Sequence, residues 1–114
     1  MIETKKPENR VFPRVGLDSP IRFQVRGAPD FGNAVCNDIS AGGLRFTSNQ
    51  FVPTEAALML EIKLLERVLR PIGKVAWSAP VAHSSRNQLG VEFLEFDMLE
   101  RNYLKEFINM RLAS

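Results

Sequence analysis

Much of this chain alternates apolar and polar residues, which is the pattern of β-strands that bury one face. The longest run covers residues 57–65, and its apolar positions are Leu58, Leu60, Ile62 and Leu64. A helix is the alternative for this run, because leucine, glutamate and lysine favour helices. The unbroken period of two favours a strand, so we expect a mainly β structure.

Five further segments have strand patterns, at residues 20–26, 32–39, 43–47, 68–78 and 88–93. Within residues 68–78, Pro71 indicates an edge strand or a bulge, because proline cannot donate to the ladder. Val75 and Trp77 of the same segment are expected to face the core. Six short strands in succession predict a small antiparallel barrel or sandwich.

The last segment changes to a helical period, and a helix is expected at about residues 97–112. Asp97 can cap it, with Glu100 three residues later in a capping-box arrangement. The expected apolar stripe consists of Leu99, Tyr103, Phe107 and Met110, widened by Leu104 and Ile108. This face is expected to cover an open end or side of the strands. Dimerisation through the same face is the alternative.

The first residues have a different composition from the rest of the 114-residue chain. Residues 1–26 hold six basic and three acidic residues, so the whole net charge of +2 lies in this quarter. Residues 1–16 also contain Pro7, Pro13 and Gly16. We therefore expect residues 1–16 to be a flexible basic arm, followed by a single domain over residues 17–114.

The chemistry of the side chains favours a binding module over an enzyme. Cys36 is the one cysteine, which excludes an internal disulfide and permits a reducing cytoplasm. The one histidine, His83, lies in a turn-like stretch, and no cysteine–histidine set has the spacing of metal ligands. No apolar run is long enough for a signal peptide or a membrane span. No metal or cofactor is expected, and the protein is expected to be cytoplasmic.

Two short stretches carry groups that suit an anionic ligand. Residues 38–43 (DISAGG) bring together the carboxylate of Asp38, the hydroxyl of Ser40 and glycine backbone that a ligand can approach closely. Residues 10–14 (RVFPR) supply the guanidinium groups of Arg10 and Arg14, which can bind phosphate or guanine with two hydrogen bonds. Each stretch is a weak signal alone, since Asp, Ser and Gly also form plain turns.

Together, in this order and before a barrel pattern, the two stretches resemble the RxxxR and [D/N]xSxxG signatures of PilZ domains. Residues 73–77 (GKVAW) and 89–93 (LGVEF) resemble later strands of that family, and the likeness covers about residues 8–110. The resemblance implies a six-stranded antiparallel β-barrel with a C-terminal helix. It also implies binding of the bacterial second messenger cyclic di-GMP (c-di-GMP).

Carried to this chain, the resemblance implies that Arg10 and Arg14 grip phosphate and guanine. Asp38 would accept hydrogen bonds from guanine, Ser40 would reach a phosphate, and Gly43 would allow close approach. Family members often have a basic residue before the first arginine, where this chain has Asn9. This departure leaves open whether one ligand or a stacked pair binds.

Three functional hypotheses follow. The first is a stand-alone c-di-GMP receptor that orders its arm on binding and contacts a protein effector, in motility or exopolysaccharide control. The second is an adaptor for protein interactions that binds no nucleotide. The third, a barrel that binds single-stranded nucleic acid, has few exposed aromatic residues to support it. The protein is expected to be a monomer or a homodimer.

Overall fold

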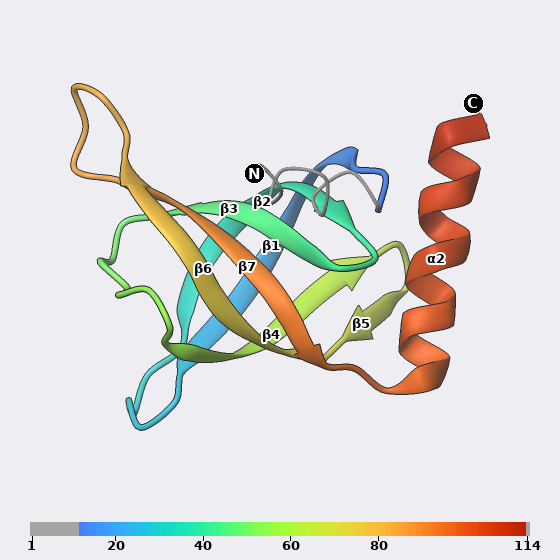
Figure 1. Cartoon of the computed structure of the whole chain (residues 1–114), viewed down its shortest axis with the longest axis horizontal. Helices are drawn as coiled ribbons and strands as arrows, with labels where there is room; N and C mark the ends of the chain where they lie inside the picture. The colour runs from blue at the N-terminus through green and yellow to red at the C-terminus, as the bar shows by residue number, and fades with distance from the viewer. Residues whose placement is uncertain (1–11, 114) are drawn as a thin grey trace, which may run out of the picture.

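A computed structural model describes residues 12–113, which form seven antiparallel strands and one helix (Figure 1). The elements are β1 (Val15–Val25), β2 (Gly32–Ser40), β3 (Gly43–Ser48), β4 (Ala57–Leu64), β5 (Arg67–Leu69), β6 (Ile72–Pro80), β7 (Asn87–Glu95) and α2 (Met98–Ala113). Six strands pair in the order β1-β2-β3-β7-β6-β4, and β1 pairs with β4 to close the barrel. The short β5 pairs with β4. The predicted six-stranded barrel with a C-terminal helix is confirmed.

The alternation along the sequence places the core inside the barrel. In β4, the apolar positions from Leu58 to Leu64 are at most 2% exposed, while Met59 on the other face is 47% exposed. The run is therefore a strand and not a helix. Phe23 of β1 and Phe46 of β3 pack in the interior with ring centroids 5.0 Å apart. Burial of these side chains is the main force that holds the barrel closed.

Strand β1 begins at Val15, five residues before the start that the pattern predicted. Val15 is buried and pairs with β2, so the last residues of the expected arm belong to the barrel wall. The pairing with β2 shifts register between Gly16 and Ser19, but the buried positions keep the same alternation on both sides of the shift. The polar Ser19 is what interrupts the apolar pattern in the sequence. The part of the predicted arm at residues 1–11, including Arg10, lies outside the described residues.

The predicted strand at residues 68–78 is two strands, β5 and β6, separated by Arg70 and Pro71. Both pair with β4, at different parts of its length. The carbonyl of Pro71 accepts a hydrogen bond of 3.1 Å from the Leu60 N–H, so the break stays attached to β4. The interruption at Pro71 is thus confirmed, but it separates two strands, whereas the sequence predicted an edge strand or a bulge within one strand.

Helix α2 begins at a cap formed by Asp97, whose Oδ2 accepts hydrogen bonds from the N–H groups of Leu99 and Glu100 at 3.1 Å each. In a capping box the Glu100 side chain would accept a hydrogen bond from the backbone N–H of Asp97. Here Glu100 Oε1 instead accepts from the backbone N–H of Arg70 at 2.8 Å. The cap was predicted, and the partner of Glu100 was not. This bond ties the start of the helix to the link between β5 and β6.

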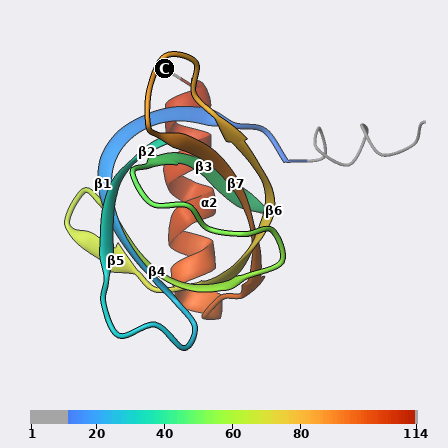
Figure 2. The same ribbon diagram turned by 90° about the vertical axis from the view of Figure 1, so that its left-hand side faces the viewer.

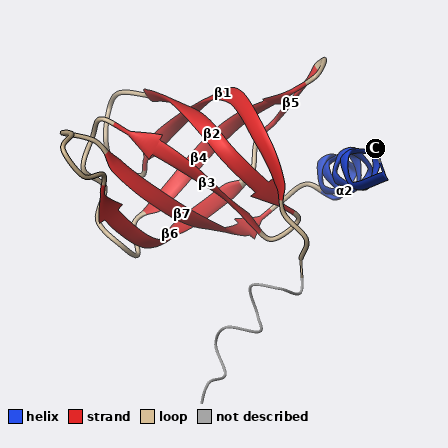
Figure 3. Cartoon of the chain, turned by 90° about the horizontal axis from the view of Figure 1, so that it is seen from above, coloured by secondary structure: helices blue, strands red, loops and turns tan. Residues whose placement is uncertain are grey.

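The helix lies across one end of the barrel, as the views along the barrel and from above show (Figures 2 and 3). It buries Leu104, Phe107 and Ile108. The predicted stripe is therefore partly wrong, because Leu99 is 76% and Met110 60% exposed. Two contacts set this rotation: the Tyr103 hydroxyl donates to the Leu64 carbonyl, and the Arg111 guanidinium donates to the Gly16 carbonyl. Among residues 12–113, no helix is long and apolar enough to cross a membrane.

Candidate functional site

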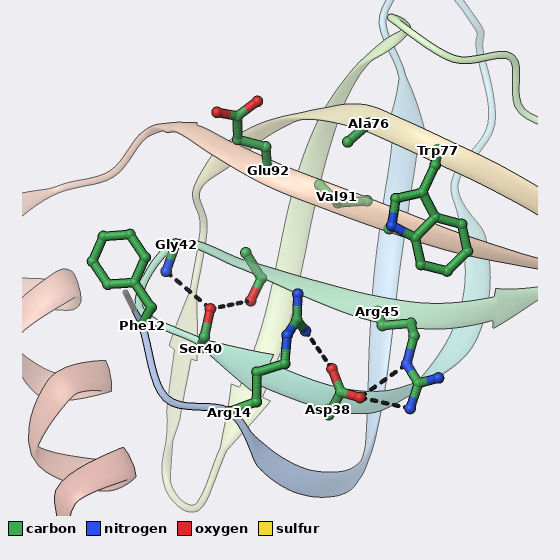
Figure 4. Close-up of a pocket in the computed structure, with 12 residues that line it drawn as sticks. Phe12, Arg14, Asp38, Ser40, Gly42, Arg45, Ala76, Trp77, Val91 and Glu92 are labelled. Carbon is green, nitrogen blue, oxygen red and sulfur yellow. Dashed lines mark hydrogen bonds and ion pairs between the residues drawn. The ribbon is translucent and has the colours of Figure 1, made fainter. Parts of the chain in front are cut away.

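A pocket of about 800 Å³ lies on the outer surface of the barrel, over β2, β3, β6 and β7 (Figure 4). This volume is in the range of small-molecule sites. Four of the five residues singled out in the sequence line it: Arg14, Asp38, Ser40 and Gly43. The fifth, Arg10, lies outside the described residues.

Asp38 lies between two arginines. Its Oδ1 is 2.6 Å from Arg14 Nη1, and its Oδ2 accepts from Nε of Arg45 at 2.8 Å and lies 2.6 Å from Nη2. The Asp38 side chain is 16% exposed, while the side chains of Arg14 and Arg45 are 43% and 38% exposed. The pocket therefore has a fixed carboxylate at its base, and both cations that hold it reach solvent.

A register shift in β2 turns Asp38 toward the pocket. Cys36 faces the core, so a regular strand would also point position 38 inward. The pairing with β3 is irregular between Cys36 and Asp38, which places Ile39 in the core and Asp38 outside. The same hairpin register sets Arg45 directly opposite Asp38.

Ser40 is the last residue of β2, just before the turn, and is 4% exposed. Its Oγ accepts a hydrogen bond from the Gly42 N–H at 3.1 Å and donates to the Gly43 carbonyl at 3.4 Å. These bonds rigidify the Ala41–Gly42 turn. Ser40 therefore lines the pocket and also stabilises the turn at its edge.

The two glycines of this turn are needed for close packing. Among the residues that the structure describes, Gly27 is the one glycine with positive φ, so Gly42 and Gly43 do not use that freedom. A Cβ on Gly42 would lie 2.7 Å from the ring of Phe12, and one on Gly43 would collide with the Val91 carbonyl. Gly43 thus lets β3 approach β7 closely, and Gly42 lets the ring of Phe12 pack directly on the backbone of the turn.

Trp77 lines the pocket and does not face the core, contrary to the sequence prediction. The pairing of β6 with β7 shifts register between Val75 and Trp77, which leaves Val75 buried and Trp77 41% exposed. A Cβ on its partner Gly90 would collide with the indole, so the ring lies across Gly90. Arg45 of β3 also pairs with Gly90, from the other neighbouring strand. Trp77 and Arg45 therefore flank Gly90 in one row across the sheet.

Sequence reasoning missed Arg45, Trp77, Phe12 and Glu92 as pocket residues. The partnership of Asp38 with Arg45 was available in principle, because a two-residue turn between Ser40 and Gly43 sets position 45 opposite position 38. The side on which Trp77 lies depends on the bulge, which has no sequence signal of comparable strength.

Beneath the pocket, Cys36 is a buried thiol and not a reactive one. Burial, and after it the negative charge of Asp38, raises the pKa of Cys36 to about 12. Its Sγ donates to the Asp38 carbonyl at 3.3 Å. Residues 12–113 contain no cluster of three or more side chains that could hold a metal ion.

The sequence matches the PilZ domain model over residues 8–110, which is most of the chain. The chain belongs to the PilZ domain family. Within that family fold it is similar to the solved structure of Bacillus subtilis inhibitor of motility (MotI/DgrA), with a TM-score of 0.77 and 16% identity over 100% of this chain and 54% of the other.

Two further solved PilZ-fold structures resemble the chain. Klebsiella pneumoniae MrkH has a TM-score of 0.76 with 13% identity, over 89% of this chain and 48% of MrkH. Escherichia coli YcgR, solved in complex with c-di-GMP, has a TM-score of 0.74 with 11% identity, over 90% of this chain and 45% of YcgR. The chain thus spans about half the length of these three proteins. No curated protein matches its sequence.

Proposed function

We propose that this PilZ domain is a c-di-GMP receptor and that the ligand binds in the pocket over β2, β3, β6 and β7. The observation that carries the proposal is the cluster of Arg14, Asp38 and Arg45 in one pocket with Ser40 and the exposed indole of Trp77. c-di-GMP offers two phosphates and two planar guanines. The pocket offers cations for the former, and a carboxylate and an aromatic face for the latter.

The phosphates would bind to the guanidinium groups. Arg14 and Arg45 each have five N–H donors. Asp38 accepts from both guanidinium groups, and Gln88 also accepts from Nη1 of Arg45. The outward donors of Arg14 can form charge-assisted bonds with phosphate oxygens, each contributing roughly 1.5–3 kcal/mol. A few such bonds, less the cost of ordering the ligand, are compatible with about micromolar affinity, which corresponds to roughly −8 kcal/mol.

One guanine would bind between Asp38 and Trp77. Oδ1 of Asp38 accepts a hydrogen bond from Arg14, and a carboxylate oxygen can accept more than one hydrogen bond. The N1–H and N2–H groups of guanine are the donors that would reach it. The exposed face of Trp77 offers a stacking surface, and such stacking contributes about 1–3 kcal/mol per base.

Signalling in this proposal depends on the N-terminal arm. Residues 12–14 already lead onto the pocket, with Phe12 against Gly42 and Arg14 at Asp38. We expect Arg10 and the rest of the arm to close over the bound dinucleotide. The new surface would then bind an unidentified protein effector, and the family points to motility or exopolysaccharide control.

The direct test is isothermal titration of the full chain with c-di-GMP, with GMP as the control ligand. We expect saturable binding of c-di-GMP at micromolar or lower concentration and much weaker binding of GMP, which has one base and one phosphate. Absence of heat with c-di-GMP, confirmed by equilibrium dialysis, would refute the proposal.

One observation favours a second candidate, an adaptor that binds no nucleotide. Helix α2 exposes Met98, Leu99 and Leu112, each at least 50% exposed, so the end of the barrel carries apolar surface that a protein could cover. A chain that forms a stable protein complex but shows no c-di-GMP binding would select this candidate over the receptor.

A further inference from the structure

The pocket contains a second carboxylate that neither signature predicts. Glu92 of β7 is exposed and lines the pocket on the side opposite Asp38, with its carboxylate turned outward from the pocket's centre (Figure 4). Its cross-strand neighbour on β6 is Lys74, but Nζ of Lys74 lies 3.5 Å from the carboxylate of Glu55. The nearest cation in register with Glu92 is therefore directed to another acid.

Glu92 lies at a different end of the pocket from Asp38. Asp38 shares a row across the strands with Arg45, Gly90 and Trp77. Glu92 shares the next outward-facing row with Ser40 and Gly43. Two strand spacings and two residues along a strand separate the acids, so their Cα atoms are on the order of 10 Å apart.

Each carboxylate has an aromatic ring at its own end. Trp77 accompanies Asp38, while the ring of Phe12, 43% exposed, is seated on Gly42 at the end where Glu92 lies (Figure 4). Arg14 lies between the two ends. The pocket thus repeats one arrangement, an acid with an aromatic ring, on either side of a central anion-binding region.

We propose that Glu92 binds the second guanine of c-di-GMP, with Phe12 as its stacking surface. This inference rests on the proposed function. The N1–H and N2–H groups of guanine lie side by side and match the two oxygens of a carboxylate, whereas adenine presents an acceptor at N1. The pocket would therefore select a ligand with guanine at both ends.

The sign of one mutational effect distinguishes this role from a passive one. A carboxylate that lies near two phosphates and binds nothing repels them, so its removal would strengthen binding. A carboxylate that accepts from guanine contributes affinity, so its removal weakens binding. Glu92→Ala should therefore change the affinity in opposite directions under the two accounts.

The experiment compares calorimetric titrations of c-di-GMP and 3′,3′-cyclic GMP-AMP into the wild type, Glu92→Ala and Glu95→Ala. Glu95 is exposed on the same strand outside the pocket, and it is the matched control for loss of one negative charge. Circular dichroism melting verifies that each variant is folded. Cyclic GMP-AMP would place its guanine at Asp38 and its adenine at Glu92, so it gains little from that acid.

We expect Glu92→Ala to weaken c-di-GMP binding at least tenfold and to change cyclic GMP-AMP binding less than threefold, while Glu95→Ala changes neither. Equal loss for both ligands, no change, or tighter c-di-GMP binding by Glu92→Ala would overturn the role of Glu92. Wild-type protein that binds neither ligand would instead refute the receptor itself, and the role of Glu92 with it.

Discussion

Nη1 of Arg14 lies 2.6 Å from Oδ1 of Asp38, joining two residues that are 24 positions apart in the chain. Arg14 belongs to the RxxxR stretch and Asp38 to the DxSxxG stretch, so this ion pair brings both signatures into one site. Arg45 completes the arrangement from β3 and holds the other carboxylate oxygen. The carboxylate is thus oriented before any ligand arrives, which lowers the cost of binding.

Arg14→Ala should weaken c-di-GMP binding more than tenfold, because it removes the guanidinium that points both to Asp38 and to the anion-binding region. Calorimetry measures the change. Arg22→Ala is the matched control, since Arg22 lies on β1 outside the pocket and pairs with Glu61. If both variants lose the same affinity, the effect of Arg14 is only that of net charge.

Trp77 should report ligand binding directly, because it is the one tryptophan of the chain and its indole lines the pocket. We expect c-di-GMP to change the intrinsic fluorescence saturably. Trp77→Leu should weaken binding by about 1–3 kcal/mol through loss of stacking. Phe51→Leu, at a position 72% exposed outside the pocket, should leave the affinity unchanged. Fluorescence that stays constant while calorimetry shows binding would place the ligand elsewhere.

Gly43→Ala should destabilise the barrel, because the new Cβ would collide with the Val91 carbonyl of β7. Steric overpacking of this kind costs about 1–3 kcal/mol, and urea denaturation measures it. A Cβ on Gly16 of β1 meets no atom within 4 Å, so Gly16→Ala should leave the free energy of unfolding nearly unchanged. Equal stability of the two variants would contradict the close approach of β3 and β7.

Cys36 should make stability fall with rising pH in alkaline solution. Burial raises its pKa from 9.0 to about 12, so the folded state retains a proton that the unfolded state loses. Its contribution is therefore complete below pH 9 and is lost as the pH rises toward 12. Between pH 9 and 12, we expect the free energy of unfolding of the wild type to fall relative to that of Cys36→Ala. Urea denaturation at several pH values measures both. A difference that is constant with pH would show that the thiol is not desolvated.

The strands could be predicted because the barrel buries one face of each, and that constraint appears in the sequence as alternation. One error occurred where a register shift changes which face a residue occupies. A regular period of two from Val75 predicts that Trp77 faces the core, but the bulge between them turns Trp77 outward. The early start of β1 has a different cause, because Ser19 and Pro20 interrupt an alternation that Val15 and Leu17 otherwise continue.

The helix and the site show what local pattern leaves out. The apolar residues of α2 form a band wider than one face, and the contacts of Tyr103 and Arg111 with the barrel decide which part is buried. Of the signature residues, Arg14, Asp38, Ser40 and Gly43 line one pocket, and Arg10 lies outside the described residues. Arg45 and Glu92 join that pocket through strand pairing, which links positions far apart in sequence.

The most direct measurement is a titration of the ¹⁵N-labelled chain with c-di-GMP, followed by amide chemical shifts. The account predicts that the largest shifts arise at Arg14, Asp38, Ser40 and Gly90 around the pocket, while Met59 and Lys63 of β4 stay in place. No shifts at saturating ligand, or shifts centred on β4, would contradict it.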